Sequence, residues 1–126
     1  MLVTTIPQYV LGMTNAKVDL TTTDATVLYT APSAADFNSS VISSILVSED
    51  SGNADTITVT LTSGTTVFSL FKVKAVGANT TVELLTNDLV LQSAEILKVT
   101  AATANRLHVV ASIQEFAIHR TPQSAL

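Results

Sequence analysis

The sequence predicts an all-β fold, an antiparallel β-sandwich or jelly roll of about eight strands. Residues 56–62 alternate strictly between threonine and an aliphatic residue, which is the pattern of a half-buried strand. Similar apolar stretches recur along the chain at intervals of roughly 8 to 12 residues, with turn signals between them. No segment keeps an apolar period of about 3.6 residues over three turns, so no amphipathic helix is expected.

The expected strands follow one another with little chain between them. In order they cover residues 16–20, 26–30, 41–48, 56–62, 65–74, 80–85, 95–101 and 106–113, with a further short strand at 89–91. The strand at 41–48 has apolar residues in both phases, which predicts a central strand covered on both faces. In the strand at 65–74, Val67, Phe71 and Val73 share one phase.

Turn chemistry separates these strands. The strand at 26–30 ends before Pro32, because proline cannot donate a hydrogen bond to a ladder. Residues 34–38 are expected to form a loop with one helical turn. The polar loop at 49–55 contains Gly52 and is expected to close a hairpin into the threonine-rich strand.

A length of 126 residues suits one domain with its own core. The sequence divides into an N-terminal arm (1–15), a β-sandwich domain (16–115) and a C-terminal tail (116–126). Within the arm, residues 9–11 are expected to pair as a short strand that Gly12 breaks. Two arrangements remain open: the arm folds back on its own domain, or it reaches across to a neighbouring molecule.

The composition favours contact with other protein surfaces. Charged residues make up only 13% of the chain, against roughly 25% in an average soluble domain. Threonine, serine and alanine fill the deficit, as is typical of strands that meet other subunits or other β-layers. The six Lys and Arg residues are scattered and the net charge is −4, so no direct binding of nucleic acid is expected.

Cysteine and targeting signals are absent from the sequence. The chain contains no cysteine, which excludes disulfides and thiolate metal sites. Residues 1–7 lack the positive and apolar regions of a signal peptide. No run approaches the roughly 20 apolar residues needed to span a bilayer. The sequence therefore predicts synthesis in the cytoplasm and no membrane partner.

Residues with catalytic chemistry do not form a recognisable constellation. The two histidines are His108, in the polar phase of its strand, and His119, in the tail. Neither accompanies a nucleophile motif. The carboxylates that a glycosidase would need in a facing pair lie at turns or on polar strand faces: Glu83, Asp88, Glu95 and Glu115. We therefore expect no enzymatic activity, no cofactor and no small-molecule substrate.

The loop at 49–55 is the one cluster of carboxylates. Asp50, Asn53 and Asp55 carry oxygens of the kind that a hard cation such as Ca²⁺ prefers. Hairpin turns use the same residue types, because Asp, Asn and Gly tolerate the backbone angles that turns require. The turn interpretation is favoured, and no metal site is assigned.

Several segments, in this order, have a familiar pattern. Residues 26–32 read Thr-Val-Leu-Tyr-Thr-Ala-Pro; Ile45-Leu46-Val47-Ser48 and its glycine-bearing loop then precede the threonine-rich strand. Later, residues 91–101 read Leu-Gln-Ser-Ala-Glu-Ile-Leu-Lys-Val-Thr-Ala, and a closing strand covers 109–115. Across residues 24–115 the chain resembles small virion structural proteins of tailed phages, although Ser93-Ala94-Glu95 stands where those proteins have a Gly-Asp turn.

The resemblance implies a role in the virion and carries over no catalytic residues. The function it favours is that of a capsid decoration (cement) protein on the outer capsid surface, which stabilises the head by bridging capsid subunits. The expected partners are the major capsid protein and copies of the chain itself, in a homotrimer. A neck, tail or fibre-attachment protein is the first alternative. A carbohydrate-binding module is the second, although the chain has no Trp and only two Tyr.

The arm and the tail are expected to supply the interface, because they carry apolar residues outside the predicted sandwich. The candidate interface residues are Ile6, Tyr9, Val10, Leu11, Phe116 and Ile118.

Overall fold

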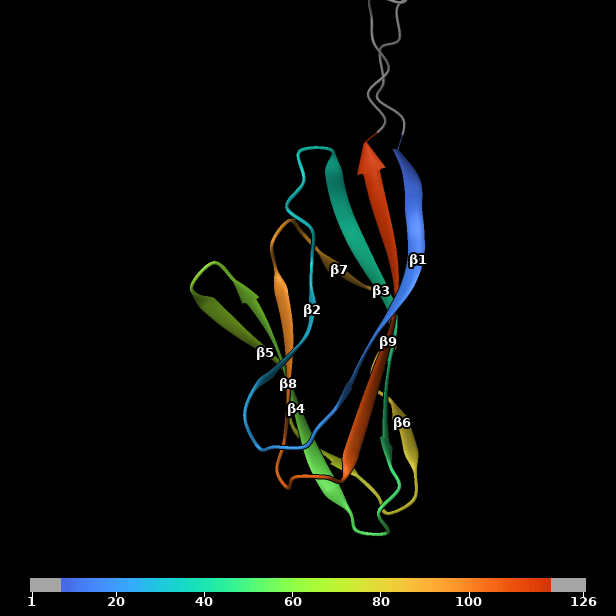
Figure 1. Ribbon diagram of the computed structural model, residues 1–126, viewed down its shortest axis with the longest axis vertical. Coiled ribbons are helices and arrows are strands. Elements are labelled where there is room, and N and C mark those ends of the chain that lie inside the picture. The colour runs from blue at the N-terminus through green and yellow to red at the C-terminus, as the bar shows by residue number, and fades with distance from the viewer. Residues whose placement is uncertain (1–7, 119–126) are drawn as a thin grey trace, which may run out of the picture.

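The computed structural model describes residues 8–118 (Figure 1). These residues form nine strands in two antiparallel sheets packed as a sandwich, and they contain no helix. The all-β class predicted from the sequence is therefore confirmed. The strands are β1 (Gln8–Asp19), β2 (Thr26–Thr30), β3 (Phe37–Glu49), β4 (Asp55–Ser63), β5 (Thr66–Val76), β6 (Thr81–Glu83), β7 (Leu89–Leu91), β8 (Ile96–Ala101) and β9 (Leu107–Ile118).

The two sheets have different edges. The first sheet has the order β1-β9-β3-β6, and β7 pairs with the same side of β3 nearer the start of that strand. The second sheet has the order β2-β8-β4-β5. In Figure 1 the hairpin formed by β4 and β5 leaves the body of the second sheet and projects to the left. No helix that could cross a membrane occurs in the described part of the chain.

The core lies between the sheets and follows the predicted alternation. Ile57 and Val59 on β4 are fully buried, and Leu61 is 9% exposed. The intervening threonines are half-buried on the outer face of the sheet. Because β-branched threonine suits a pleated surface, it extends the strand without adding apolar area on the outside.

Strand β3 is central in its sheet, as expected, but it is not covered on both faces. Leu46 is 40% exposed, whereas Ile45 and Val47 on either side of it are fully buried. The register with β9 shifts between Ile42 and Ser44, which marks a β-bulge. The extra residue turns the following part of the strand over, so apolar residues occur in both phases of the sequence although one face alone is buried.

Bulges also separate the apolar residues of β5. Val67 pairs with Thr62 on the outer face, whereas Phe71 pairs with the buried Val59. The expectation that Val67, Phe71 and Val73 share one face is therefore wrong. The register of β5 against β4 shifts on both sides of Val59, which breaks the period-2 rule over this stretch.

The expected boundaries at residues 15 and 115 fall inside two paired strands. Strand β1 begins at Gln8, runs through Gly12 with a register shift, and pairs with β9 as far as Ile118. Gly12 therefore does not break the strand, because the bulge between Val10 and Gly12 absorbs the irregularity. Residues 8–15 of the expected arm lie on their own domain.

The loop before β3 differs from the expectation as well. Residues 35 and 36 form a turn, closed by the Phe37 amide, which donates to the Ala34 carbonyl oxygen over 3.0 Å. No helical turn is present there. Phe37 is 8% exposed and already belongs to β3, so burial of its ring fixes the start of the strand.

Candidate functional site

The proposed calcium ligands of the loop at 49–55 do not converge. Asp50 Oδ1 lies 3.2 Å from His108 Nε2, and Asp55 Oδ2 accepts a hydrogen bond from the Thr103 amide over 3.1 Å. The Asn53 backbone amide donates to Ser51 Oγ over 3.3 Å, and the Asn53 side-chain Nδ2 donates to the Ser51 carbonyl oxygen over 3.5 Å. No group of three or more metal-ligating side chains occurs in residues 8–118. The loop is organised by its own hydrogen bonds, as a turn is.

The melting temperature is expected to be the same in Ca²⁺ and in EDTA, because these side chains have protein partners in different places. A ligand that binds only the folded state stabilises it by RT ln(1 + c/Kd) at a free ligand concentration c, so the melting temperature rises with ligand concentration. Scanning fluorimetry across a Ca²⁺ titration measures this directly. A melting temperature that rises with Ca²⁺ and returns with EDTA would show that the loop binds the ion.

Glu49 is the more deeply buried of the two buried carboxylates that flank this loop, 1% exposed against 8% for Asp55. Its side chain accepts four hydrogen bonds: from Ser51 Oγ, from the Ser51 amide at 2.8 Å, and from the Gly52 and Asn79 amides at 3.1 Å each. Burial raises the pKa of Glu49, but these hydrogen bonds favour the charged form and together lower the pKa to about 2. Glu49 therefore links the β3–β4 loop to the β5–β6 turn through hydrogen bonds to both.

His108 lies on the outer face of the first sheet, as its phase predicts. Its Nδ1 is 3.4 Å from Asp19 Oδ1 and its Nε2 is 3.2 Å from Asp50 Oδ1. The imidazole is partly exposed, and it links β1 to the β3–β4 loop. His119 lies outside the described residues.

Three of the four carboxylates considered for glycoside hydrolysis accept hydrogen bonds in different parts of the fold. Glu83 accepts from Ser44 Oγ, from the Ile45 amide at 2.8 Å and from the Leu85 amide at 3.2 Å. Burial raises the pKa of Glu83, and these bonds outweigh it and lower the pKa. Glu95 accepts from the Gln92 amide over 2.7 Å. Glu83 therefore joins β6 to β3, and Glu95 closes the turn at 92–95. Glu83 and the fourth carboxylate, Asp88, both line the pocket described below.

Glu115 belongs to a polar cluster that joins the sheets. The Tyr29 hydroxyl, from β2, donates to Glu115 Oε2 over 2.5 Å and lies 2.6 Å from Oγ of the fully buried Ser40. Burial, followed by the hydrogen bond to Glu115, raises the pKa of Tyr29. Because Ser40 and Glu115 lie on the first sheet and Tyr29 lies on the second, these hydrogen bonds link the two sheets. Both hydroxyl groups of the cluster have a hydrogen-bond partner.

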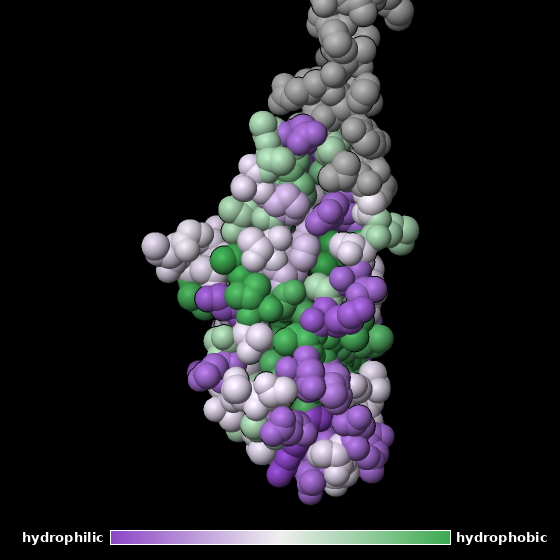
Figure 2. All heavy atoms as spheres, in the orientation of Figure 1, coloured by the Kyte–Doolittle hydropathy of each residue, from purple (hydrophilic) through white to green (hydrophobic). Residues whose placement is uncertain are grey.

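Strand β5 is largely exposed: eight of its eleven residues are exposed. It ends its sheet, so one of its edges has no partner in residues 8–118. Val67 is 61% exposed and Phe68 is 51% exposed, and Val73 is 59% exposed. In Figure 2 the projecting hairpin forms a lobe on the left, and apolar side chains extend across the face below it. An unpaired edge with apolar side chains is a surface on which other chains can pair.

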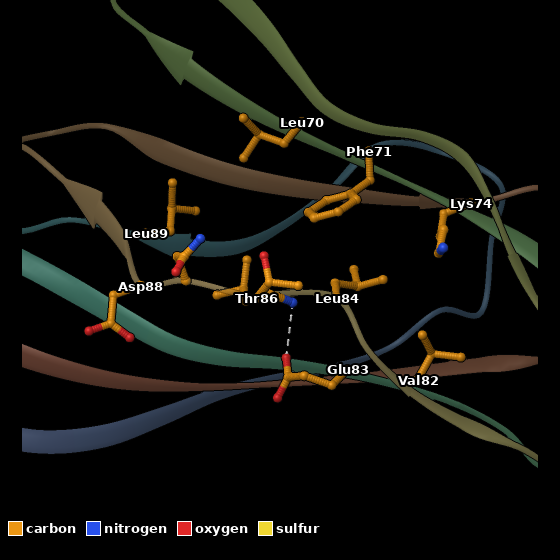
Figure 3. Close-up of a pocket in the computed structure, with 11 residues that line it drawn as sticks. Leu70, Phe71, Lys74, Val82, Glu83, Leu84, Thr86, Asp88 and Leu89 are labelled. Atoms are coloured by element: carbon orange, nitrogen blue, oxygen red, sulfur yellow. Dashed lines mark hydrogen bonds between the residues drawn. The ribbon is translucent and has the colours of Figure 1, made fainter.

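An apolar pocket of about 530 Å³ adjoins this edge. It lies between β5 and the segment that connects β6 to β7, where the two sheets are open toward each other. In Figure 3, Leu70 and Phe71 point from β5 toward the segment that carries Leu84 and Leu89. Apolar pockets with a few polar groups at the rim are the usual form of binding sites in proteins. The pocket and the free edge together form one surface, called here the β5 surface.

Comparison of the chain with family models, with curated proteins and with solved structures finds no match.

The residues expected to form the interface lie mainly on the β1–β9 pair. The backbones of Tyr9 and Val10 pair with Ala117 and Phe116, and Leu11 lies at the register shift that follows. Phe116 is half-buried, and the backbone of Ile118 pairs with Gln8. Ile6 lies outside the described residues. Pairing of β1 with β9 therefore brings most of these positions to one end of the first sheet.

The β5 surface was not among the residues expected to form the interface. An edge position depends on the order of strands in a sheet, which local alternation does not reveal. The one local signal is the run of uncharged residues at 65–71, in which apolar and hydroxyl side chains do not separate cleanly into two faces.

Proposed function

We propose that this chain is a structural protein of a tailed-phage virion, and within that class a capsid decoration protein. In this role it binds the major capsid protein and further copies of itself, as a homotrimer, on the outer surface of the capsid. It bridges neighbouring capsid subunits and so stabilises the head. The resemblance of residues 24–115 to small virion proteins is the starting point, and the sandwich fold is consistent with the strand and turn chemistry on which that resemblance depends.

The observation that carries this proposal is the β5 surface. A long edge strand with exposed Val67, Phe68 and Val73 adjoins an apolar pocket, so a large part of one side of the molecule is suited to contact with protein. Apolar surface of this kind on a small domain is characteristic of interaction sites. An interface of standard size buries roughly 800 Å² on each partner. Many identical weak contacts on a shell then add through avidity.

The polar surfaces support the same role. The outer face of β4 carries half-buried threonines instead of charged residues. Burying charge in an interface costs free energy unless each charge is paired, whereas threonine can be covered at lower cost. A shell protein that must meet several neighbours benefits from faces of this composition.

The test is co-sedimentation of the purified protein with capsids that lack it. The wild-type chain is expected to pellet with the capsids up to a fixed number of copies per shell. Protein that stays in the supernatant at all concentrations would contradict the proposal. A variant without residues 1–7 leaves β1 whole, because the strand begins at Gln8. Loss of binding by this variant would assign the contact to the N-terminal residues, and retained binding would assign it to the described domain.

A further inference from the structure

The free edge of β5 has two halves with opposite character. The C-terminal half carries Lys72 and Lys74 around Val73, whose φ is +53°. Lysines and irregular backbone on an edge are the features that prevent unwanted strand pairing. The N-terminal half, residues 66–71, carries no charge. The C-terminal half of the edge is therefore protected against pairing with another strand, and the N-terminal half is open to such pairing.

The irregularity at Val73 is well defined. A positive φ is rare for a β-branched residue and places it in the left-handed region. The Val73 amide donates to Thr58 Oγ1 over 3.1 Å instead of to the backbone of β4. Because the backbone of β5 is irregular at Val73, a partner strand can pair with this edge only over residues 66–71.

An exposed aromatic ring and an apolar pocket lie next to each other on this edge. Phe68 pairs with Leu61, so its ring shares the inner face of the sheet, and it is 51% exposed because it lies on the projecting hairpin. Leu70 and Phe71, two and three residues farther along the strand, line the pocket. When a two-fold axis relates two copies, the projecting group of each copy can fill the cavity of the other.

We propose that the β5 surface binds a second copy of the chain through antiparallel pairing of residues 66–71 of both copies around a two-fold axis. Phe68 of each copy then covers the pocket of the other, and the two four-stranded sheets become one. This contact specifies one of the self-contacts in the proposed function. It differs from the three-fold contact of a homotrimer, because a two-fold axis relates two copies.

The distribution of charge favours a second copy as the occupant. In an antiparallel pair centred on Ser69, residues 67–71 of one copy meet residues 67–71 of the other, and all of these are uncharged. In this register Lys72 of each copy lies opposite Thr66 of the other copy, and Lys74 lies opposite Gly64 in the neutral turn. No two lysines are therefore opposed, and like charges that would prevent self-pairing stay apart.

The first test is the mass of the protein in solution, measured by light scattering over a range of concentrations. The monomer has a mass of 13.2 kDa. The wild-type chain is expected to form a dimer, or a hexamer where the three-fold contact of the homotrimer also forms in solution. Phe68→Lys places a charge on the open half of the edge and is expected to raise the dimer dissociation constant by at least about tenfold. Val27→Lys is the matched control, because Val27 is 50% exposed on β2, the opposite edge of the same sheet.

Support for the β5 contact would be a wild-type dimer that Phe68→Lys converts to monomer, or a hexamer that it converts to trimer, while Val27→Lys leaves the mass unchanged. A monomer at every concentration would overturn it, as would a trimer whose mass Phe68→Lys leaves unchanged. A dimer weakened equally by both variants would also overturn it. A trimer that Phe68→Lys does not change would contradict the β5 contact but not the proposed function. Failure to bind capsids would contradict the proposed function but not the β5 contact, so the two proposals can be tested separately.

A cross-link provides evidence that does not depend on a disruptive variant. Because the chain has no cysteine, Ser69→Cys introduces a single thiol near the proposed axis. Ser93→Cys, at an exposed loop position, is the control. Mild oxidation is expected to give a disulfide-linked dimer for Ser69→Cys and not for Ser93→Cys. Equal yields for the two variants, or no dimer from Ser69→Cys, would exclude the pairing.

Discussion

Replacing Glu49 by glutamine is expected to lower the melting temperature at neutral pH and to remove part of the acid sensitivity of the fold. The carboxylate accepts hydrogen bonds from the amides of Ser51, Gly52 and Asn79, together with the Ser51 hydroxyl. A neutral amide side chain has one oxygen instead of two and no charge, so amide donors that it leaves unpaired lose stabilisation. The β3–β4 loop and the β5–β6 turn are expected to loosen together.

The pH dependence follows from the direction of the pKa shift. The pKa of Glu49 is about 2 in the folded protein, against an ordinary value of 4.5. The unfolded chain therefore binds the proton more readily. The stabilisation is fully present above pH 4.5 and is lost as the pH falls from 4.5 toward 2. Calorimetry from pH 7 to pH 2 should show a steeper loss of stability for wild type than for Glu49→Gln.

The control for Glu49 is Asp36→Asn, which removes a negative charge from an exposed turn. This variant is expected to melt as the wild type does at every pH. If Glu49→Gln and wild type lose stability in parallel between pH 4.5 and pH 2, the carboxylate does not hold the two loops in the way described.

Replacing Leu97 by alanine is expected to destabilise the protein by about 2–5 kcal/mol, the usual cost of removing a buried leucine side chain. Leu97 is fully buried on β8 and pairs with Leu61 and Tyr29 on the two neighbouring strands. The cavity left by the truncation lies between the sheets, where the surrounding strands cannot close it fully. Urea unfolding followed by far-UV circular dichroism measures the change in the free energy of unfolding.

Leu46→Ala makes the same chemical change on the outer face of β3, where Leu46 is 40% exposed. Its cost is expected to be below about 1 kcal/mol, because the side chain is already partly in water. Equal costs for the two variants would mean that the outer face of β3 is covered in solution, as the sequence first suggests and as an assembled interface would require.

Much of the fold is predictable from short-range pattern. The strand at 56–62 alternates cleanly, and its burial follows that alternation without exception. The strands at 26–30 and 89–91 also match. Strand β4 keeps a continuous register with β8, so its alternation is unbroken. Strand β2 has a register shift between Val27 and Tyr29, but the turn residues on either side still set its bounds.

The departures have a common physical cause. A bulge adds one residue to a strand, and every later side chain then points to the opposite face. On β3 this made a one-sided strand look two-sided, and on β5 it separated Val67 from Phe71. A bulge of this type can be located only from the partner strand, which local sequence does not identify.

The role of Glu49 depended on a contact distant in sequence. Glu49 stands before a polar loop and was grouped with the turn residues around it. Its burial follows from the amide of Asn79, which lies 30 residues farther along the chain. Neither this contact nor the position of β5 at a sheet edge is present in any local pattern, and both follow once the order of the strands is known.

The copy number of the chain in purified virions tests the central claim most directly. Quantitative gel analysis against a known amount of the major capsid protein gives this number. A decoration protein is expected at on the order of hundreds of copies per particle, as the symmetry of an icosahedral shell requires, whereas a neck ring holds about a dozen. Hundreds of copies would confirm the account, about a dozen would move the chain to the neck or tail, and its absence from the particle would contradict a structural role in the virion.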